Sequence, residues 1–386
     1  MKGGDAMNMT CSTLLRAVMV WAFLILMFTM TAYGKDGGTK SEPASSVIKA
    51  DPADWKKVLE AARKEGKLVM SGDPSEAWRR SLVDMFQQDY PEIKVDYTGM
   101  NGRNIQPRVR QERELGQKLW DLFAGGTTTA FEMKNDGFLD PLLPQLLPEN
   151  ADDTKWVGGV DGLFYDRENK YNACYSMYVQ PTVSVNRDFI KESELKSSGQ
   201  LLDQKFKGKI VMQNPVSGAT FSALGNLAFM YGEKFVRDLL SRQSVAVTDD
   251  KRQQAEWVVR GKHPIAIGFN ETQLVVFQKQ GLGKNVTTLE DKVTPVATGL
   301  GCISLFKDVP HPNAAKVYIN WLLSRNTQAK VAKNVLLNSR RTDVPVVDKG
   351  TAVDPARLSI YRRYSTEENT AITGRLLPAI KEALQK

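Results

Sequence analysis

The sequence predicts an α/β protein whose two lobes are joined by a two-strand hinge. Its length of 386 residues exceeds what one hydrophobic core usually organises, so two domains are expected. Strands alternate with helices in two separate regions, which favours parallel sheets covered by helices. Residues 171–188 and 293–306 are strand-rich and separate those regions. We interpret them as the two crossings of a hinge, an arrangement that allows the lobes to close.

The beginning of the chain has the pattern of an export signal. Two basic residues precede an apolar run over residues 17–30, and a small-x-small cleavage pattern ends at Gly34. This order is typical of a cleaved signal peptide over residues 1–34, with an uncleaved signal anchor as the alternative. Residues 35–50 are polar and predict a flexible leader. The protein is therefore expected in the periplasm.

The first lobe is predicted to comprise residues 51–180 and 301–345. Its first helix places Trp55, Val58 and Ala62 on one apolar face. Turns rich in glycine, proline and polar residues then separate short apolar strands from helices. The expected order is a strand at 67–70, a helix through Trp78 and Phe86, a strand at 93–97, a helix at 104–116, a strand at 119–124 and a helix that ends near Gly137.

The second lobe is predicted to comprise residues 181–300, and Pro181 interrupts the first crossing. Apolar runs bounded by glycine and proline indicate the same alternation of strands and helices. The expected order is a strand at 209–212, an apolar helix through Met230, helices at 232–241 and 250–260, and a strand at 265–267. Residues 346–386 are expected to form a C-terminal helical segment.

Composition limits the kind of partner. The formal net charge is +8, and 25% of the residues are charged. This mild basic excess suits an anionic small ligand, or simply contributes to solubility. The Lys and Arg residues are dispersed without interleaved aromatic residues, so nucleic acid is not expected. Export would permit a disulfide between Cys174 and Cys302, but their spacing leaves the pairing open.

Catalytic motifs are missing from the sequence. The two histidines, His263 and His311, each precede a proline. The chain contains no HExxH zinc motif, no GxSxG nucleophile motif and no GxxxxGK[ST] phosphate loop. We therefore expect no catalytic residues, no metal site, no cofactor and no enzymatic activity. A secreted enzyme that uses Asp and Glu residues on the same fold is the alternative.

From Trp55 to Val347 the sequence resembles the family 1 extracellular solute-binding proteins of bacterial ABC importers, close to the ferric-ion-binding subgroup. The motifs that carry the resemblance are WDLFAGG at 120–126, KFKGKIVMQNPVSG at 205–218, PHPNAAK at 310–316 and NSRRTDV at 338–344. The resemblance implies a type 2 periplasmic-binding fold with the ligand cleft between the lobes. It also implies a monomer that works with a separately encoded permease and ATPase. A scavenging receptor without a transporter is a further alternative.

The sequence departs from the ferric-ion-binding subgroup at the metal ligands. Members of that subgroup carry two adjacent tyrosines just after a strand of the second lobe, where this chain has GFNETQLVVF at 268–277. They often add a histidine in the loop after the first strand, which here has none between Ser71 and Glu76. Ferric ion therefore becomes the alternative to a small anionic organic solute, namely a carboxylate, phosphonate or phosphate ester.

Candidate ligand-binding residues follow the strands, because open α/β sheets bind ligands at the carboxyl ends of their strands. Two of these loops would open helices with unpaired N–H groups, which suit a carboxylate or phosphate, although ordinary helix caps explain them equally. Arg103 could hold an anion in a bidentate fork, and Glu271 opposite it would suit a zwitterion. The candidates are Asp73, Ser75, Glu76, Arg103, Gly126, Thr127, Thr128, Tyr178, Ser217, Gly218, Ala219, Thr220, Asn270 and Glu271.

Overall fold

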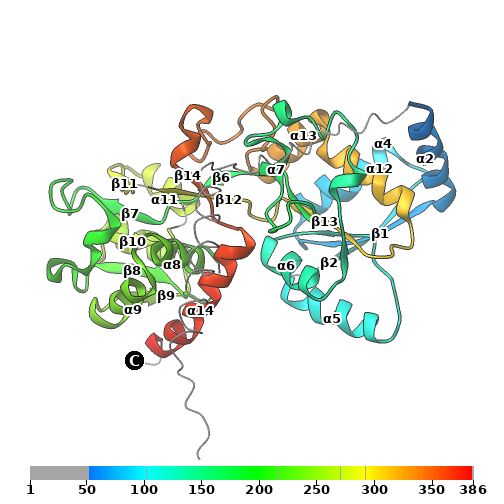
Figure 1. The fold of residues 1–386 in the computed structure, drawn as a ribbon. Helices are drawn as coiled ribbons and strands as arrows, with labels where there is room; N and C mark the ends of the chain where they lie inside the picture. Colours follow the sequence, from blue (N-terminus) through cyan, green and yellow to red (C-terminus); the bar gives the residue numbers. More distant parts are fainter. Residues whose placement is uncertain (1–51, 101, 217, 270, 292, 385–386) are drawn as a thin grey trace, which may run out of the picture. The chain divides into compact units, whose positions relative to one another are not determined.

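A computed structural model describes residues 52–100, 102–216, 218–269, 271–291 and 293–384. The expected signal peptide and leader lie outside these residues. The described chain forms two larger sheets, each covered by helices, and a smaller third sheet (Figure 1). None of the described helices is long and apolar enough to cross a membrane.

The first sheet combines strands from both ends of the chain. Its order is β2 (Lys94–Gly99), β1 (Lys67–Gly72), β3 (Leu122–Ala124), β13 (Cys302–Phe306) and β4 (Leu139–Asp140), and β5 (Asn172–Cys174) also pairs with β13. Strand β1 is parallel to β2 and β3, whereas β13 is antiparallel to β3, β4 and β5. The chain therefore returns to this sheet through β13 after building the second one.

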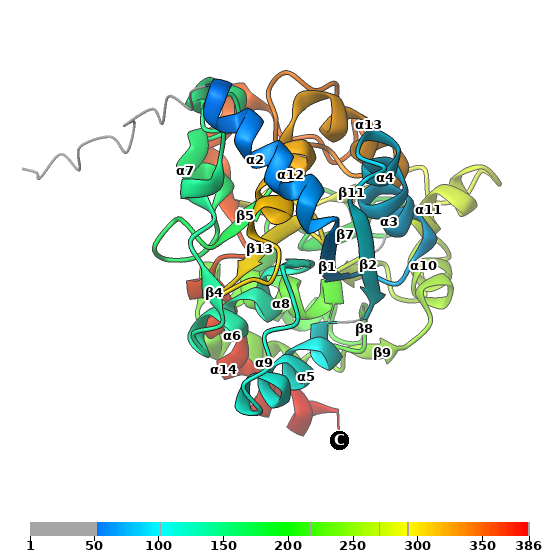
Figure 2. The same cartoon turned by 90° about the vertical axis from the view of Figure 1, so that its right-hand side faces the viewer.

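Helices cover both faces of the first sheet because side chains alternate along its strands. Leu68 and Leu122 lie in one apolar core, whereas Val69 and Phe123 belong to the other. The first core is covered by α2 (Pro52–Glu65), α3 (Glu76–Arg79), the π-helical turn η1 (Arg80–Asp84), α4 (Met85–Asp89), α12 (Pro312–Leu323) and α13 (Arg325–Val335). The second is covered by α5 (Gly102–Glu114) and α6 (Thr127–Asn135). Figure 2 shows α2 against α12 on the first face.

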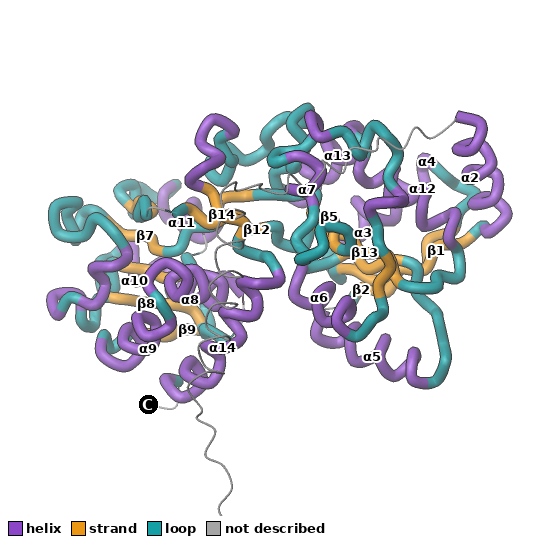
Figure 3. Tube along the Cα trace, in the orientation of Figure 1, coloured by secondary structure: helices purple, strands orange, loops and turns teal. Residues whose placement is uncertain are grey.

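The second sheet has the order β11 (Val286–Thr288), β7 (Val183–Asn186), β10 (Ile265–Ile267), β8 (Ile210–Gln213) and β9 (Ala246–Thr248). Strands β8, β9 and β10 are parallel, and β7 is antiparallel to β10 and β11. One face packs against α8 (Gly218–Tyr231), α9 (Glu233–Arg242) and α14 (Glu367–Ala383). The other packs against α10 (Lys251–Val259) and α11 (Glu271–Gln278). In Figure 3 the strands of each sheet lie among these helices.

The third sheet contains the two crossing segments. Strand β6 (Tyr178–Val179) pairs antiparallel with β12 (Thr294–Ala297), and β14 (Tyr361–Arg363) pairs parallel with β12. Strand β6 leads the chain from β5 to β7, and β12 leads it back from β11 to β13. The sequence indicates no strand in residues 346–386, where the structure has η6 (Pro355–Ile360), β14 and α14. The short elements elsewhere are η2 (Leu143–Gln145), η3 (Asp153–Lys155), α7 (Gly159–Leu163), η4 (Ser198–Leu202) and η5 (Gln204–Phe206).

Helix α14 contacts elements of both larger sheets. It packs against α8 through buried Leu376 and Ile380, which belong to the core of the second sheet. At its first turn, Glu367 accepts a hydrogen bond from Lys134 of α6 at 2.7 Å and another from the backbone N–H of Arg167 at 3.1 Å. The C-terminal helix therefore bridges the helices that flank the two sheets.

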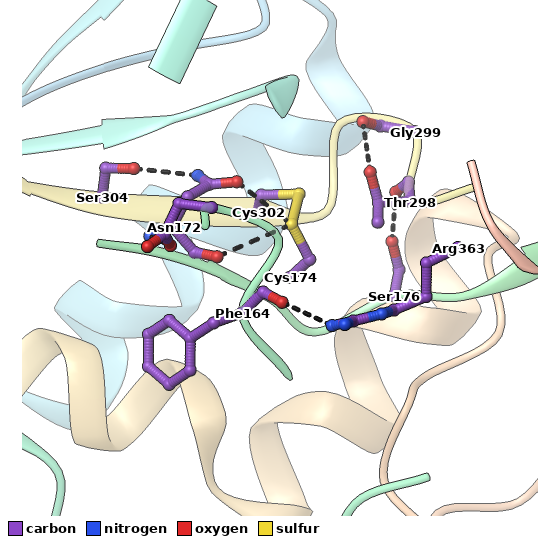
Figure 4. The surroundings of a disulfide bond; sticks show 10 residues. Phe164, Asn172, Cys174, Ser176, Thr298, Gly299, Cys302, Ser304 and Arg363 are labelled. Carbon is purple, nitrogen blue, oxygen red and sulfur yellow. Dashed lines mark hydrogen bonds between the residues drawn. A yellow bond between two sulfur atoms is a disulfide. The ribbon is translucent and has the colours of Figure 1, made fainter. Parts of the chain in front are cut away.

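Cys174 and Cys302, whose pairing the sequence leaves open, are joined in a disulfide. The two residues are directly opposite each other on the antiparallel strands β5 and β13. Both are fully buried, in an apolar cluster with Phe131 and Tyr165. The bond therefore links the strand from which the chain leaves the first sheet to the strand on which it returns (Figure 4).

Candidate functional site

The first candidate loop leads from β3 into α6. Gly126 is the N-cap of α6 in an extended conformation, and it provides no side-chain cap for the N–H groups of the first turn. Thr127 is buried and Thr128 is exposed. A Cβ atom on Gly102 would overlap the hydroxyl of Thr129, so the start of α5 lies directly against the start of α6. This contact places Arg103, the second residue of α5, beside the first turn of α6.

The crossing segments border this helix start. A Cβ atom on Gly126 would lie 3.9 Å from the carbonyl oxygen of Gly299 and from Cδ2 of Leu300. A Cβ atom on Gly299 would in turn lie 3.4 Å from Cε1 of Tyr178. Tyr178 is partly exposed, and within the described part of the chain its hydroxyl makes no hydrogen bond. The ring of Tyr178 and the N-terminus of α6 therefore both lie next to Gly299.

The second candidate loop leads from β8 into α8. The side-chain amide of Gln180 is 3.5 Å from the carbonyl oxygen of Ala219, so the first crossing also touches the first turn of α8. Thr220 is 1% exposed, and its hydroxyl has no hydrogen-bond partner among the described residues. A buried hydroxyl without a partner is uncommon in folded proteins. The crossing segments thus lie next to the start of α6 through Gly299 and next to the start of α8 through Gln180.

Gly268, which follows β10, places the end of a third strand against the first turn of α8. Its φ is +63°, and a Cβ atom there would lie 2.5 Å from Cα and 2.6 Å from N of Thr220. Only glycine allows the backbone after β10 to pass this close to α8. The chain then continues to Asn270, which lies outside the described residues, and to Glu271, the first residue of α11. Glu271, the first residue of α11, therefore follows soon after Gly268 in the sequence, and Gly268 lies against the first turn of α8.

The remaining candidate loop follows β1 and makes mainly local contacts. The carboxylate of Asp73 accepts the backbone N–H of Ser75 at 2.9 Å, and its carbonyl oxygen accepts the hydroxyl of Tyr97 at 2.6 Å. Ser75 caps α3 without a side-chain hydrogen bond. Glu76 forms an exposed ion pair with Arg80 at 2.8 Å. These contacts account for Asp73 as a turn residue and for Glu76 as a surface residue.

The positions of some candidate side chains lie outside what the structure describes. Ser217 and Asn270 lie outside the described residues, and the same holds for the side chains of Arg103 and Glu271. Gly218 is the first residue of α8. The start of α6 at Gly126 and the ring of Tyr178 both lie next to Gly299 of the second crossing, and the start of α8 at Ala219 lies next to Gln180 of the first crossing. Sequence reasoning missed Gln180, Gly268 and Gly299, whose roles depend on contacts between distant segments.

The grouped residues present donors rather than anionic ligands. The first turn of an α-helix has unpaired N–H groups and a positive end of the helix dipole, which attract anions. Burial raises the pKa of Tyr178, so its phenolate form is disfavoured. Among the described residues, no group of three or more His, Cys, Asp or Glu side chains is arranged to hold a metal ion. The arrangement can therefore hold a small anion through backbone N–H groups and hydroxyls.

Both histidines have structural partners. Nδ1 of His311 lies 2.8 Å from the buried carboxylate of Asp121, which also accepts the backbone N–H groups of Val69 and His311. Nδ1 of His263 lies 2.9 Å from the carbonyl oxygen of Gly208. The contacts of His311 and Asp121 connect β1, the residue before β3 and the start of α12. The contact of His263 connects the turn before β10 to the turn before β8.

Two larger sheets linked by paired crossing strands define the two-lobed α/β class of fold. The chain belongs to the bacterial extracellular solute-binding protein family, whose family model matches residues 71–329. Members of this family are binding proteins of transporters and act outside the cytoplasm. Such proteins work with separate permease and ATPase subunits.

Solved structures have the same fold. Iron-bound HitA from Pseudomonas aeruginosa is 16% identical with a TM-score of 0.59, and the match covers 82% of this chain and 99% of that one. FutA from Trichodesmium, solved with iron and citrate, is 17% identical with a TM-score of 0.58, covering 83% and 98%. An ABC transporter structure from Clostridium perfringens is 14% identical with a TM-score of 0.65, covering 82% and 99%. At these identities the likeness concerns the fold.

One curated relative also matches. A Haemophilus influenzae protein described as uncharacterized is 26% identical over 194 residues, which is 47% of this chain. The match spans 54% of that protein, or about half of its length.

Proposed function

We propose that this chain is the periplasmic substrate-binding component of an ABC importer, and that it captures a small anionic organic solute between its two lobes. The solute class is a carboxylate, a phosphonate or a phosphate ester, which the protein delivers to a membrane permease driven by a separate ATPase. The observation that supports this proposal is that each crossing segment lies next to a helix start, Gly299 beside Gly126 of α6 and Gln180 beside Ala219 of α8. Binding at this place would favour closure only through a higher affinity for the closed form.

The charge and the donors support an anionic solute. The chain has a formal net charge of +8, and the N-cap of α6 has no side chain to satisfy the first N–H groups. The unpaired hydroxyl of Thr220 adds a donor close to the start of α8. A negatively charged group would satisfy these donors and gain from both helix dipoles.

Ferric ion is the second candidate, because iron-bound HitA and iron- and citrate-bound FutA have the same fold. Ferric ion prefers several anionic oxygen ligands. The described candidates include one tyrosine, Tyr178, whose pKa is raised by burial. This observation favours the organic anion over the metal.

Thermal unfolding in the presence of a solute panel tests the proposal. A bound solute at 100 times its dissociation constant is expected to add about 2.7 kcal/mol to the free energy of unfolding. The panel contains carboxylates, aminophosphonates, phosphate esters, amino acids, and ferric ion with and without citrate. We expect an upward shift with an organic anion. A shift with ferric ion alone would contradict the proposal in favour of iron, and turnover of a bound solute would favour the enzyme alternative.

Replacing Arg103 by alanine is expected to weaken the binding of that anion by about tenfold or more, because a hydrogen bond to a charged group contributes roughly 1.5–3 kcal/mol. Isothermal titration calorimetry measures the change. Arg108→Ala is the matched control on the same helix, since Arg108 pairs with Glu112 and lies over Trp120. Equal affinities of the Arg103→Ala and Arg108→Ala variants would remove Arg103 from the solute site.

A further inference from the structure

The turns at one edge of the second sheet form a continuous surface. Strands β8, β9 and β10 are parallel and β7 is antiparallel to β10, so the residues before these three strands lie at the same edge as the residues after β7. The start of β11 lies there as well, because β11 is antiparallel to β7. The candidate solute loops follow β8 and β10 and therefore lie at the opposite edge. The turns of the first edge, which we name the basic edge, comprise residues 186–196, 203–209, 238–245, 256–263 and 279–285.

The basic edge has an excess of cations. It contains eleven lysines and arginines and six aspartates and glutamates, which gives it a formal charge of +5, whereas the whole chain has +8. Three of the six carboxylates pair with a cation of the same edge, in the pairs Asp203–Lys205, Asp238–Arg242 and Glu256–Arg260. The other three are within residues 188–194, close in sequence to three further cations. The excess charge therefore comes from lysines in the other turns.

Five lysines of the basic edge are exposed, namely Lys207, Lys209, Lys262, Lys279 and Lys284. None of them forms an ion pair with a carboxylate of the described residues. Nδ1 of His263 lies 2.9 Å from the carbonyl oxygen of Gly208, so the turns before β8 and β10 are in contact. A lysine ammonium is a strongly hydrated point charge without the fork geometry of a guanidinium. Such groups suit many loosely arranged phosphates better than one defined anion.

Aromatic rings lie among these lysines. Phe189 is 48% exposed. A Cβ atom on Gly261 would lie 2.4 Å from its Cε1 and Cζ atoms, so the ring lies directly against the turn that carries Lys262. The ammonium of Lys262 is 4.3 Å from the ring centre of Trp257, which is partly exposed. Aromatic rings beside lysines are typical of protein surfaces at the headgroup level of a membrane.

We propose that the basic edge docks on an anionic phospholipid surface, with its lysines among the headgroup phosphates and the ring of Phe189 at the boundary with the acyl chains. The charges are complementary, and the exposed ring favours a lipid surface, which has an apolar layer beneath its charges, over a soluble polyanion. Because the candidate solute loops lie at the opposite edge of the sheet, docking leaves them uncovered. The inference therefore does not depend on which solute the protein captures.

Sedimentation with vesicles tests the surface. The full chain is mixed with vesicles of equal parts phosphatidylglycerol and phosphatidylcholine. Vesicles of phosphatidylcholine alone measure any binding through the apolar run at residues 17–30. We expect stronger binding to the anionic vesicles at about 0.1 M salt, and its loss at about 1 M salt, where the screening length falls from about 10 Å to about 3 Å.

Two double variants identify the residues. Lys207→Gln with Lys209→Gln is expected to weaken binding to the anionic vesicles about 25-fold, at about fivefold for each lysine. The urea midpoint should stay that of the parent, because both side chains are exposed and unpaired. Lys330→Gln with Lys333→Gln is the matched control, since these two lysines are exposed on α13 and form no ion pair with a described carboxylate. Phe189→Ala is expected to weaken binding several-fold through loss of apolar contact.

Any of four results would overturn the proposal. Equal binding to the two kinds of vesicle, or binding that persists at about 1 M salt, would assign it to the apolar run. Equal binding by the two double variants would exclude the basic edge as the docking surface. Tighter binding to soluble polyglutamate than to the anionic vesicles, unchanged by Phe189→Ala, would assign the edge to an acidic protein partner. Solute capture is measured separately, so the importer proposal stands or fails independently of these results.

Discussion

Replacing Gly268 by alanine is expected to lower the free energy of unfolding by about 3 kcal/mol and to abolish solute binding. The new methyl group would lie 2.5 Å from Cα of Thr220, and both contacting partners are backbone atoms that cannot rotate away. The backbone at Gly268 also has φ of +63°, which L-residues adopt at a cost. Relief of the overlap requires the first turn of α8 to shift, and that turn supplies the proposed anion site.

Gly281→Ala separates the two causes. Gly281 has φ of +86°, but a Cβ atom there has no neighbour within 4 Å. This variant is expected to lose only the backbone contribution, about 1 kcal/mol, and to bind solute normally. Urea unfolding and solute titration of both variants provide the comparison. Equal losses of stability in Gly268→Ala and Gly281→Ala would show that the contact with Thr220 does not matter.

Removing the disulfide by the double replacement Cys174→Ala and Cys302→Ala is expected to lower the free energy of unfolding by about 2–5 kcal/mol. The two cysteines are 128 residues apart in sequence, and the loop they close contains the whole second sheet. Closing so long a loop restricts the unfolded chain strongly, which is the main source of the stabilisation in the chain-entropy account.

The parent protein under reducing conditions is the control for the cysteine variant. Its urea midpoint is expected to fall to that of the double variant, whereas the double variant should not respond to the reductant. A parent protein whose midpoint is the same with and without reductant would contradict a stabilising disulfide. The comparison also separates loss of the bond from loss of two buried sulfur atoms.

Long periodic elements and apolar short strands such as β10 could be predicted from the sequence, but several other short strands could not. The apolar stripe through Trp55 and Ala62 predicts the helix that the structure shows as α2, and the α/β class is confirmed. The strand expected at 119–124 begins only at Leu122. Strands such as β4 and β14 have two or three residues, and their pairing depends on neighbouring strands rather than on any local pattern.

The candidate site could also be predicted only in part. Strand-to-helix loops are visible in the sequence, because glycine and hydroxyl residues after an apolar run indicate a helix start. The residues that contact those loops from distant parts of the chain cannot be identified from the sequence. Gln180 reaches Ala219, and Gly268 passes close to Thr220, because β10 lies between β7, which follows Gln180, and β8, which leads into α8. The disulfide is similar, since the register of β5 on β13 decides it. Solute binding by these loops stays a prediction.

The position of α14 has a mechanical consequence. The helix is fixed to α8 by apolar packing, while its Glu367 holds Lys134 of α6 and the backbone of Arg167. In the proposed opening and closing of the lobes, α14 could not follow both α6 and α8 if these helices separated. Either it would travel with α8 and its bonds to Lys134 and Arg167 would break, or those bonds would limit the separation. The tail of the chain would then act as a tether between the two helices.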